Sequence, residues 1–184
     1  MRIISGKYRG RVLMSPQGSD IRPSTDRIKE NIFNILQKYN TDGIILDLFA
    51  GSGALGIEAL SRGASRVIFV DTSKESTTLV KANLDKIKAD LQAYEIFCTD
   101  YTIALKKLQG TQFDIILIDP PYNSVYAQKA IELISQHDLL RDGGVIVVER
   151  AKEEVLTIDA QVYIEDLRVY GNTCVSFITR QTST

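Results

Sequence analysis

Asp119-Pro120-Pro121-Tyr122 brings a carboxylate, two prolines and an aromatic ring together directly after an apolar run. That run, residues 113–118, is rich in β-branched side chains, which is typical of a buried parallel strand. Two consecutive prolines lack backbone donors and fix φ, so neither a strand nor a helix continues through them. The pattern predicts a rigid loop at the carboxyl end of a strand, where open α/β sheets bind ligands.

These side chains suit a planar molecule that carries an amino group. The carboxylate of Asp119 and a free carbonyl can accept the amine hydrogens, and the ring of Tyr122 can stack on a base. The motif resembles the (Asp/Asn)-Pro-Pro-(Tyr/Phe) signature of S-adenosylmethionine-dependent enzymes that methylate exocyclic or amide nitrogens. A tight turn with a capping Asp would contain the same residues. The four residues alone leave both interpretations open.

A glycine-rich motif precedes this loop. The segment 51–56 is a full Gly-x-Gly-x-x-Gly pattern after an apolar run, and Asp71 ends the next apolar run. Glycines let the backbone approach a ligand, and a carboxylate at the second strand accepts two ribose hydroxyls. The pattern also fits a nicotinamide dinucleotide. Asp47 favours another cofactor, because a carboxylate there repels a pyrophosphate but can face, directly or through water, the amino group of a methionine moiety.

Two further residues follow the third expected strand. Asp100 stands where S-adenosylmethionine enzymes hydrogen-bond the adenine amino group, and Tyr101 is a candidate to pack near that ring. A helix N-cap would also explain Asp100. Because the glycine-rich turn, Asp71, Asp100 and Asp119 fall at successive strand ends, the sequence favours a methyltransferase over a dinucleotide-binding oxidoreductase.

The elements that position these groups alternate along the chain. The expected strands are residues 44–49, 66–70, 94–98, 113–118 and 145–149. The first expected helix follows the glycine-rich motif and ends near residue 62. The next three span residues 74–88, 101–108 and 125–136. Residues 162–169 and 174–179 indicate a terminal hairpin. This order predicts an α/β fold of the class I methyltransferase (Rossmann-like) type: a mostly parallel seven-stranded sheet, helices on both faces and an antiparallel carboxyl-terminal hairpin strand.

The amino-terminal segment differs from the rest in charge. Residues 2–5 and 11–14 predict a small β-hairpin, and residues 26–39 predict an amphipathic helix. Seven basic residues before position 30 face only two acidic ones. We therefore expect residues 1–40 to be a basic hairpin-plus-helix extension of a single methyltransferase domain that spans residues 1–184.

Composition excludes several classes of protein. A net charge of −1 argues against coating nucleic acid over the whole surface. No apolar run approaches the roughly 20 residues that span a bilayer, and the amino terminus lacks the apolar core of a signal peptide, so we expect no membrane association and a cytoplasmic location. Cys98 and Cys174 are expected to be reduced core residues. A single histidine, His137, with two distant cysteines builds no known zinc site, so no metal is expected.

Three segments resemble the RsmD family of bacterial 16S ribosomal RNA guanine-N2 methyltransferases: RIISGKYRGR (2–11), RPSTDRIKENIFNIL (22–36) and DLFAGSGALGIEALSRGA (47–64). The resemblance runs from residue 2 to about 150, and residues 170–173 also resemble the terminal hairpin of that family. Ser24 stands where members usually carry Thr, and residues 151–168 match least.

The resemblance implies methyl transfer from S-adenosylmethionine to the N2 amine of one guanine in 16S rRNA, within an assembling small ribosomal subunit. The residues expected to act on the amine are Asp119, Pro120, Pro121 and Tyr122. The residues expected to hold the cofactor are Thr25, Asp47, Phe49, Ala50, Gly51, Gly53, Asp71, Thr72, Asp100 and Tyr101. The residues expected to bind RNA phosphates are Arg9, Arg11, Arg22, Arg27 and Lys29.

Other functions fit the same residues. Adenine N6 in nucleic acid and a protein glutamine amide each present a planar amine. The chain has no room for a large DNA-recognition domain, and its basic amino terminus favours a nucleic-acid substrate over a protein one. A non-catalytic RNA-binding assembly factor is a third possibility. We expect a monomer, because no long apolar surface helix demands a partner.

Overall fold

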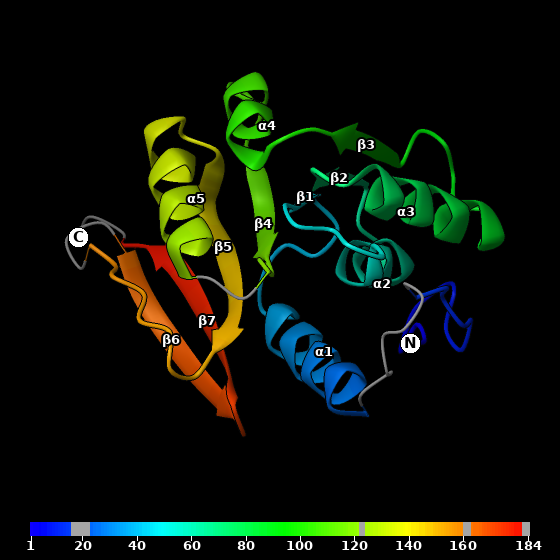
Figure 1. Cartoon of the computed structure of the whole chain (residues 1–184), viewed down its shortest axis with the longest axis horizontal. Helices are drawn as coiled ribbons and strands as arrows, with labels where there is room; N and C mark the ends of the chain where they lie inside the picture. Colours follow the sequence, from blue (N-terminus) through cyan, green and yellow to red (C-terminus); the bar gives the residue numbers. More distant parts are fainter. Residues whose placement is uncertain (16–22, 122–123, 160–162, 182–184) are drawn as a thin grey trace.

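The computed structural model describes residues 1–15, 23–121, 124–159 and 163–181, with the backbone alone at 23–25, 124 and 164. Within these residues, seven strands form one sheet in the order β3-β2-β1-β4-β5-β7-β6 (Figure 1). The strands are β1 Ile44–Asp47, β2 Arg66–Asp71, β3 Tyr94–Cys98, β4 Phe113–Ile118, β5 Leu140–Ala151, β6 Tyr163–Tyr170 and β7 Thr173–Arg180. The helices are α1 Pro23–Leu36, α2 Ala54–Arg62, α3 Lys74–Lys86, α4 Tyr101–Lys107 and α5 Ser124–Gln136.

The sheet is parallel from β3 through β5 and antiparallel at β7 and β6. β6 and β7 form a hairpin that turns at Gly171, whose φ of 62° suits a residue without Cβ. Because β7 lies between β5 and β6, the hairpin adds one antiparallel strand beside β5. The predicted fold class, a mostly parallel sheet with an antiparallel terminal hairpin strand, is confirmed.

Two apolar cores cover the two faces of the sheet. Helices α1, α2 and α3 lie over one face, and α4 and α5 lie over the other (Figure 1). Every residue of β4 is buried, as expected for a central strand that is covered on both faces. Alternate residues of the central strands enter opposite cores, which is the period-two pattern of a strand.

Several element boundaries differ from the sequence expectations. α1 begins at Pro23 and ends at Leu36, three residues earlier at each end than expected. Proline is tolerated in the first turn of a helix because its missing N–H has no partner there anyway. β5 is longer than expected because Leu140 pairs with Phe113 at one end, while residues up to Ala151 pair with β7 at the other.

The amino-terminal residues fold back on themselves without regular strands. The predicted hairpin is reduced to one isolated antiparallel bridge, between Arg2 and Val12. The backbone N–H of Ile3 donates to the Arg11 carbonyl at 2.9 Å, and the N–H of Gly10 donates to the Ile3 carbonyl at 2.9 Å. So short a ladder is weak alone, and contacts with α2 hold the segment in place.

Glu58 of α2 makes the main contact with this segment. Its fully buried carboxylate accepts from the backbone N–H of Ile4 at 2.8 Å and of Ser5 at 3.0 Å. Gly6 has a φ of +84°, and a Cβ at that position would lie 1.7 Å from the Ser61 carbonyl oxygen. The amino-terminal segment is therefore docked on α2 through its backbone.

Two smaller findings concern the cysteines and the helices. Cys174 is buried, but Cys98 is exposed, so the expectation that both cysteines are core residues is wrong for Cys98. Cys98 is the last residue of β3, an edge strand, where one side has no neighbouring strand. None of the described helices is long and apolar enough to cross a membrane.

Candidate functional site

Four carboxylates stand at the same edge of the sheet. Asp71 ends β2, Asp47 ends β1, Asp119 follows β4, and Glu149 lies near the end of β5. These four strands are neighbours and run parallel, so their carboxyl ends meet at one edge. The residue two positions earlier on each strand packs into the core beneath α1, α2 and α3. Side chains two apart share a face, so all four carboxylates project from that face of the sheet. We call these four residues the acidic edge.

The glycine-rich turn is held by two of these carboxylates. Asp71 accepts from the backbone N–H of Gly51 at 2.9 Å through Oδ2, and from that of Ser73 at 2.8 Å through Oδ1. Asp47 accepts from the N–H of Gly56 at 2.9 Å. A Cβ at Gly56 would lie 2.3 Å from the Phe69 ring, so this close approach requires glycine. The motif thus ties the turn before α2 to the end of β2, and the first turn of α2 to the end of β1.

Burial and mutual repulsion both affect the acidic edge. Asp47 is 1% exposed, and burial raises its pKa to about 7, against a lowering by the Gly56 N–H and with smaller increases from Asp119 and Asp71. Asp119 reaches solvent, yet the protein atoms around it disfavour its charged form and raise its pKa to about 6. Burial, and then the charge of Asp119, raises the pKa of Glu149 to about 8.

No lysine or arginine among the described residues forms an ion pair with the acidic edge. Buried carboxylates without a cation are costly, and a ligand that brings positive charge or N–H donors relieves that cost. These carboxylate acceptors therefore fit a cationic or amine-rich ligand better than a pyrophosphate.

Three aromatic rings lie beside this edge. The ring centroids of Phe49 and Tyr101 are 5.2 Å apart, and Tyr126 lies edge-on to Tyr101 at 6.0 Å. Phe49 follows β1, Tyr101 opens α4, and Tyr126 is on α5 just after the Pro-Pro loop. These rings offer apolar surface for a planar base. Asp100 caps α4 by accepting from the N–H of Thr102 at 2.8 Å, so the N-cap interpretation of that residue holds.

The remaining residues expected to contact the cofactor lie in or near the loops that follow β1 and β2, or outside the described side chains. Ala50 is buried, and its N–H donates to the Val70 carbonyl at 3.0 Å. Gly53 caps α2 with a φ of 79°. Thr72 is exposed just after β2. The side chain of Thr25 lies outside the described residues. These groups, with the acidic edge and the aromatic rings, fit a nucleoside that carries a cationic amino acid.

The Pro-Pro loop is described up to its second proline. Pro120 is buried and Pro121 is exposed. Tyr122 lies outside the described residues, so its expected stacking on a base stays a prediction. Sequence reasoning missed Glu149 and Tyr126. In the sequence, Glu149 only ends an ordinary apolar run. What identifies it as a candidate site residue is its position at the end of β5, the strand next to β4.

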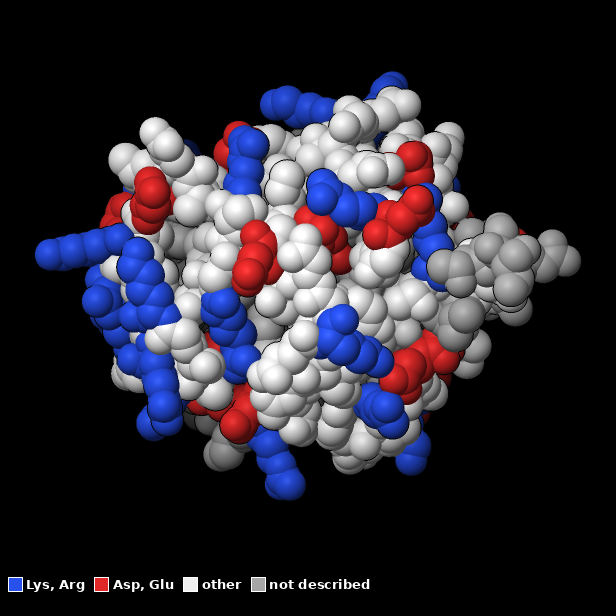
Figure 2. All heavy atoms as spheres, turned by 180° about the vertical axis from the view of Figure 1, so that it is seen from behind, with Lys and Arg blue, Asp and Glu red and all other residues white. Residues whose placement is uncertain are grey.

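Basic side chains gather over the amino-terminal side of the molecule (Figure 2). The exposed ones in that segment are Arg2, Lys7, Arg9 and Arg11. One guanidinium nitrogen of Arg11 already donates to the Ile87 carbonyl at 2.7 Å. Arg27 is exposed on α1, whereas Arg22 lies outside the described residues.

Lys29 has a different environment from the one expected. Its side chain is 4% exposed and donates to the Arg2 carbonyl at 2.6 Å, and its ammonium lies 3.6 Å from Glu58. Burial lowers the pKa of Lys29, and the Glu58 charge partly opposes that effect. Lys29 therefore supports the amino-terminal segment and is not placed to contact a phosphate. The amphipathic pattern of α1 did not reveal this, because lysines mostly lie on exposed faces.

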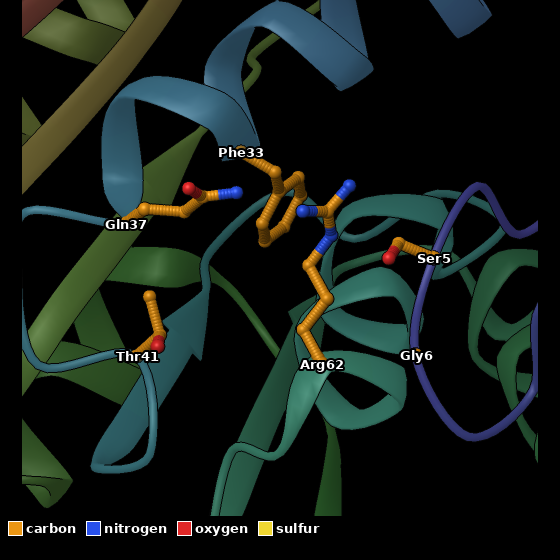
Figure 3. A pocket seen from close by; sticks show the side chains of 6 residues that line it. All are labelled: Ser5, Gly6, Phe33, Gln37, Thr41 and Arg62. Atoms are coloured by element: carbon orange, nitrogen blue, oxygen red, sulfur yellow. The ribbon is translucent and has the colours of Figure 1, made fainter.

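A pocket of about 210 Å³ lies elsewhere, between α1, the amino-terminal segment and the end of α2 (Figure 3). Its lining residues are Ser5, Gly6, Phe33, Gln37, Thr41 and Arg62. The Arg62 guanidinium lies 5.0 Å from the centre of the Phe33 ring and pairs with Glu58 at 2.8 Å. Thr41 precedes β1 and Arg62 ends α2, so this pocket is at the amino ends of the strands. It contains none of the candidate residues.

Comparisons with known proteins agree with this arrangement. The sequence profile of the family described as Conserved hypothetical protein 95 matches residues 1–179. Ribosomal RNA small subunit methyltransferase D of Escherichia coli K12 is 34% identical over 98% of this chain and 90% of its own length. The protein of the same name from Haemophilus influenzae is 38% identical over 85% of this chain and 81% of its own.

Solved structures are similar over the whole chain. The Escherichia coli protein yhhF superposes with a TM-score of 0.87 at 32% identity, covering 100% of this chain and 99% of that one. The Thermus thermophilus protein TTHA0928 superposes with a TM-score of 0.81 at 27% identity, covering 97% of this chain and 99% of that one.

Proposed function

Because this chain belongs to the Conserved hypothetical protein 95 family, to which the RsmD-type methyltransferases belong, we propose that it methylates rRNA with S-adenosylmethionine. More specifically, we propose transfer to the exocyclic N2 amine of one guanine in 16S rRNA. The observation that carries this proposal is the position of Asp119, which follows β4 two residues beyond the Leu117 that pairs with Asp47 of β1, close enough for its charge to raise the pKa of Asp47. The names of the curated relatives support an rRNA substrate.

The chain offers a group for each part of the cofactor. Bound at the acidic edge, S-adenosylmethionine would supply an electrophilic methyl carbon on a positively charged sulfur. Asp71 would accept ribose hydroxyls with the lone pairs left by Gly51 and Ser73. Phe49 and Tyr101 would hold the adenine ring between them and the strand ends. Asp47 would compensate the amino group through its remaining oxygen or through water.

Asp119 and Pro120 would orient the substrate amine. A guanine amine is a poor nucleophile, because its lone pair is delocalised into the ring. Hydrogen bonds from that amine to the Asp119 carboxylate and the Pro120 carbonyl favour a pyramidal nitrogen with its lone pair aimed at the methyl carbon. Such positioning contributes on the order of 7–11 kcal/mol to catalysis. Tyr122 would stack on a guanine flipped out of the RNA.

RNA phosphates would bind along the amino-terminal segment. Arg9, Arg11 and Arg27 are exposed there, and Arg22 is a further candidate by sequence. Binding through them would weaken as salt rises. Lys29 is left out of this set because it is buried. We further propose that the protein acts as a cytoplasmic monomer on an assembling small ribosomal subunit.

The substrate is tested by deleting the gene in its own host and mapping rRNA methylation by nucleoside mass spectrometry. The expected result is loss of one N2-methylguanosine from 16S rRNA, restored by the wild-type gene. Loss of an N6-methyladenosine, or of a methylated glutamine in a ribosomal protein, would instead identify one of the other planar amines as the acceptor. Calorimetry with S-adenosylhomocysteine and with NAD(H) tests the cofactor separately, and binding of NAD(H) alone would overturn the methyltransferase assignment.

Asp119→Asn tests the role of the carboxylate. The amide has one acceptor oxygen and no charge, so we expect kcat to fall at least about a hundredfold. Binding of S-adenosylhomocysteine and RNA should change less than about threefold. Asp142→Asn is the matched control, because Asp142 is an exposed carboxylate on β5 that is 97% open to solvent. Equal turnover of the two variants would remove Asp119 from the mechanism.

A further inference from the structure

Glu149 stands beside Asp119 on the neighbouring strand. β4 and β5 run parallel, and the last residue pair in their register is Ile118 with Val148. Asp119 and Glu149 are the residues that follow this pair on the two strands. The side chains two positions earlier pack in the same core, so strand alternation directs both carboxyls to the same face. Neighbouring parallel strands are about 4.8 Å apart, which brings the two carboxyls within reach of each other.

The charged groups around this pair are acidic or are directed elsewhere. The neighbour of β4 on its other side, β1, contributes Asp47, and the next strand, β2, contributes Asp71. Both side chains are carboxylates. β7 places Val175 opposite Glu149. Arg150, the next residue of β5, points to the other side. One of its nitrogens donates to the Glu154 carbonyl at 2.7 Å, and another lies 3.6 Å from the Glu165 carboxylate.

The helices near this face do not neutralise the pair within the described part of the chain. On α1, Lys29 is paired with Glu58, and Arg27 is exposed and forms no ion pair with either carboxyl. The backbone of the amino-terminal segment is docked on Glu58 of α2, and Arg11 of that segment donates to the Ile87 carbonyl at the end of α3. Two adjacent carboxyls without a cation cannot both ionise cheaply, and one proton shared between them removes most of the repulsion.

We propose that Glu149 is a positioning residue, which in its protonated form donates a hydrogen bond to the Asp119 carboxylate and fixes its orientation. This inference rests on the proposed function, since it assigns Glu149 a role in the same methyl transfer. The pair then carries one negative charge. That charge stays on Asp119, whose remaining lone pairs accept the hydrogens of the substrate amine. Without Glu149, the side chain of Asp119 could face the amine in several orientations. Asp119 follows the last residue of β4, and its backbone has no further strand partner.

The ionisation of the two groups is consistent with this division of roles. The protein atoms around Asp119, which still reaches solvent, raise its pKa to about 6, and desolvation followed by the charge of Asp119 raises the pKa of Glu149 to about 8. Between these values Asp119 is ionised and Glu149 holds a proton. Both changes are in the direction expected of adjacent acids in a partly desolvated site.

A titration without substrate tests the shared proton independently of any activity. Carboxyl carbon NMR of the full-length labelled protein should show one Glu side chain that stays protonated well above pH 6. In Asp119→Asn, that titration should move about one pH unit lower, because the neighbouring charge is gone. Titration of every Glu near pH 4.3 would overturn the proposal. The titration can be measured even if the protein methylates no rRNA.

Kinetics of two Glu149 variants test the role in catalysis. Glu149→Gln keeps a hydrogen-bond donor and should lower kcat about threefold at pH 7, whereas Glu149→Ala should lower it about a hundredfold, which is the cost of a misoriented catalytic group. KM for RNA should stay within about twofold in both. Wild-type kcat should fall above pH 8, as Glu149 loses its proton, and Glu149→Gln should lack that fall.

Glu153→Gln, an exposed change just after β5, is the matched control and should behave as wild type at every pH. Wild-type turnover of Glu149→Ala, or the same alkaline fall in Glu149→Gln as in wild type, would overturn the inference. Equal losses in Glu149→Gln and Glu149→Ala would also overturn it, because the amide keeps the hydrogen-bond donor that the proposal requires; a packing role would be rescued by the similarly shaped amide as well, but it would give no alkaline fall in the wild type. A wild-type protein without methyltransferase activity would refute the proposed function instead, and the titration would still decide on the pair.

Discussion

At the scale of single residues, the sequence shows which groups can do chemistry but not how they constrain one another. Asp71 and Asp119 were predictable because each stands at the end of an apolar run, and Asp47 because it shortly precedes the glycine-rich turn. Glu149 was not, since nothing in sequence marks the strand beside β4 until the sheet order is known. Lys29 shows the converse: its side chain looks like a surface cation, yet a buried partner from a distant helix holds it.

Gly56 provides a prediction at this scale. In Gly56→Ala, the new Cβ would meet the Phe69 ring at 2.3 Å and the Asp47 carboxylate at 2.9 Å, both in buried surroundings. We expect a loss of about 1–3 kcal/mol in the free energy of unfolding, typical of overpacking. Binding of S-adenosylhomocysteine should weaken at least tenfold, because the first turn of α2 must move. Urea unfolding and calorimetry measure the two effects.

Gly110→Ala is the control for that substitution. Its φ is +91°, but a Cβ there meets nothing within 4 Å, so only backbone strain of about 1 kcal/mol is expected. Ligand binding should be unchanged. If Gly56→Ala bound the ligand as tightly as Gly110→Ala, the glycine-rich turn would not be part of the cofactor site.

At the scale of elements, periodicity identified the strands and helices, and long-range pairing set their ends. Residues 94–98 and 113–118 form strands with the expected bounds, because turn residues flank each apolar run. β5 extends beyond its apolar stretch because its neighbours supply hydrogen bonds at both ends. The amino-terminal hairpin was overestimated as an independent element. Its pattern of short apolar pairs reflects docking on α2 rather than a ladder of its own.

Glu58 gives the corresponding prediction. It accepts from two backbone N–H groups of the amino-terminal segment and lies against Lys29 and Arg62, all in buried surroundings. Glu58→Gln removes the charge that two buried cations require, and the expected loss is about 3–5 kcal/mol of stability. The amides of Ile4 and Ser5 should exchange faster with solvent hydrogen. RNA affinity should fall, while calorimetric binding of S-adenosylhomocysteine stays within about threefold.

Glu75→Gln on α3, where the side chain is exposed, is the control and should change none of these quantities. Loss of cofactor binding in Glu58→Gln to the same degree as RNA binding would mean that the amino-terminal segment is not a separate RNA-binding element.

At the scale of the whole molecule, charge is divided between two regions. Exposed arginines and lysines gather on the amino-terminal side (Figure 2). Carboxylates without an ion-pair partner among the described residues lie at the ends of the central strands. The sequence indicates the basic segment directly, because its charges are contiguous. The acidic edge is assembled from residues up to about a hundred positions apart, so only the sheet order reveals it. A nucleic acid drawn to the basic side would then meet a site that favours amines.

The acidic edge should make the free protein less stable as pH rises. Asp47 ionises near pH 4 in an unfolded chain, whereas in the folded protein burial raises its pKa to about 7. Between these values the folded state binds more protons than the unfolded state. Stability therefore falls from about pH 4 to about pH 7 and is level above that, as far as Asp47 is concerned. Glu149 acts in the same direction, up to about pH 8.

Asp47→Asn isolates this effect, because the amide oxygen can still accept from the Gly56 N–H while the buried charge is gone. We expect the variant to be about 1–3 kcal/mol more stable than wild type at pH 8 and indistinguishable from it near pH 4, by urea unfolding of the ligand-free protein. It should also bind S-adenosylhomocysteine at least tenfold more weakly, since a carboxylate that costs stability is retained here for the ligand it compensates. A variant that is destabilised at pH 8, or equally stabilised at both pH values, would show that the Asp47 charge is already compensated within the folded chain. In that case the acidic edge would not need a cationic ligand.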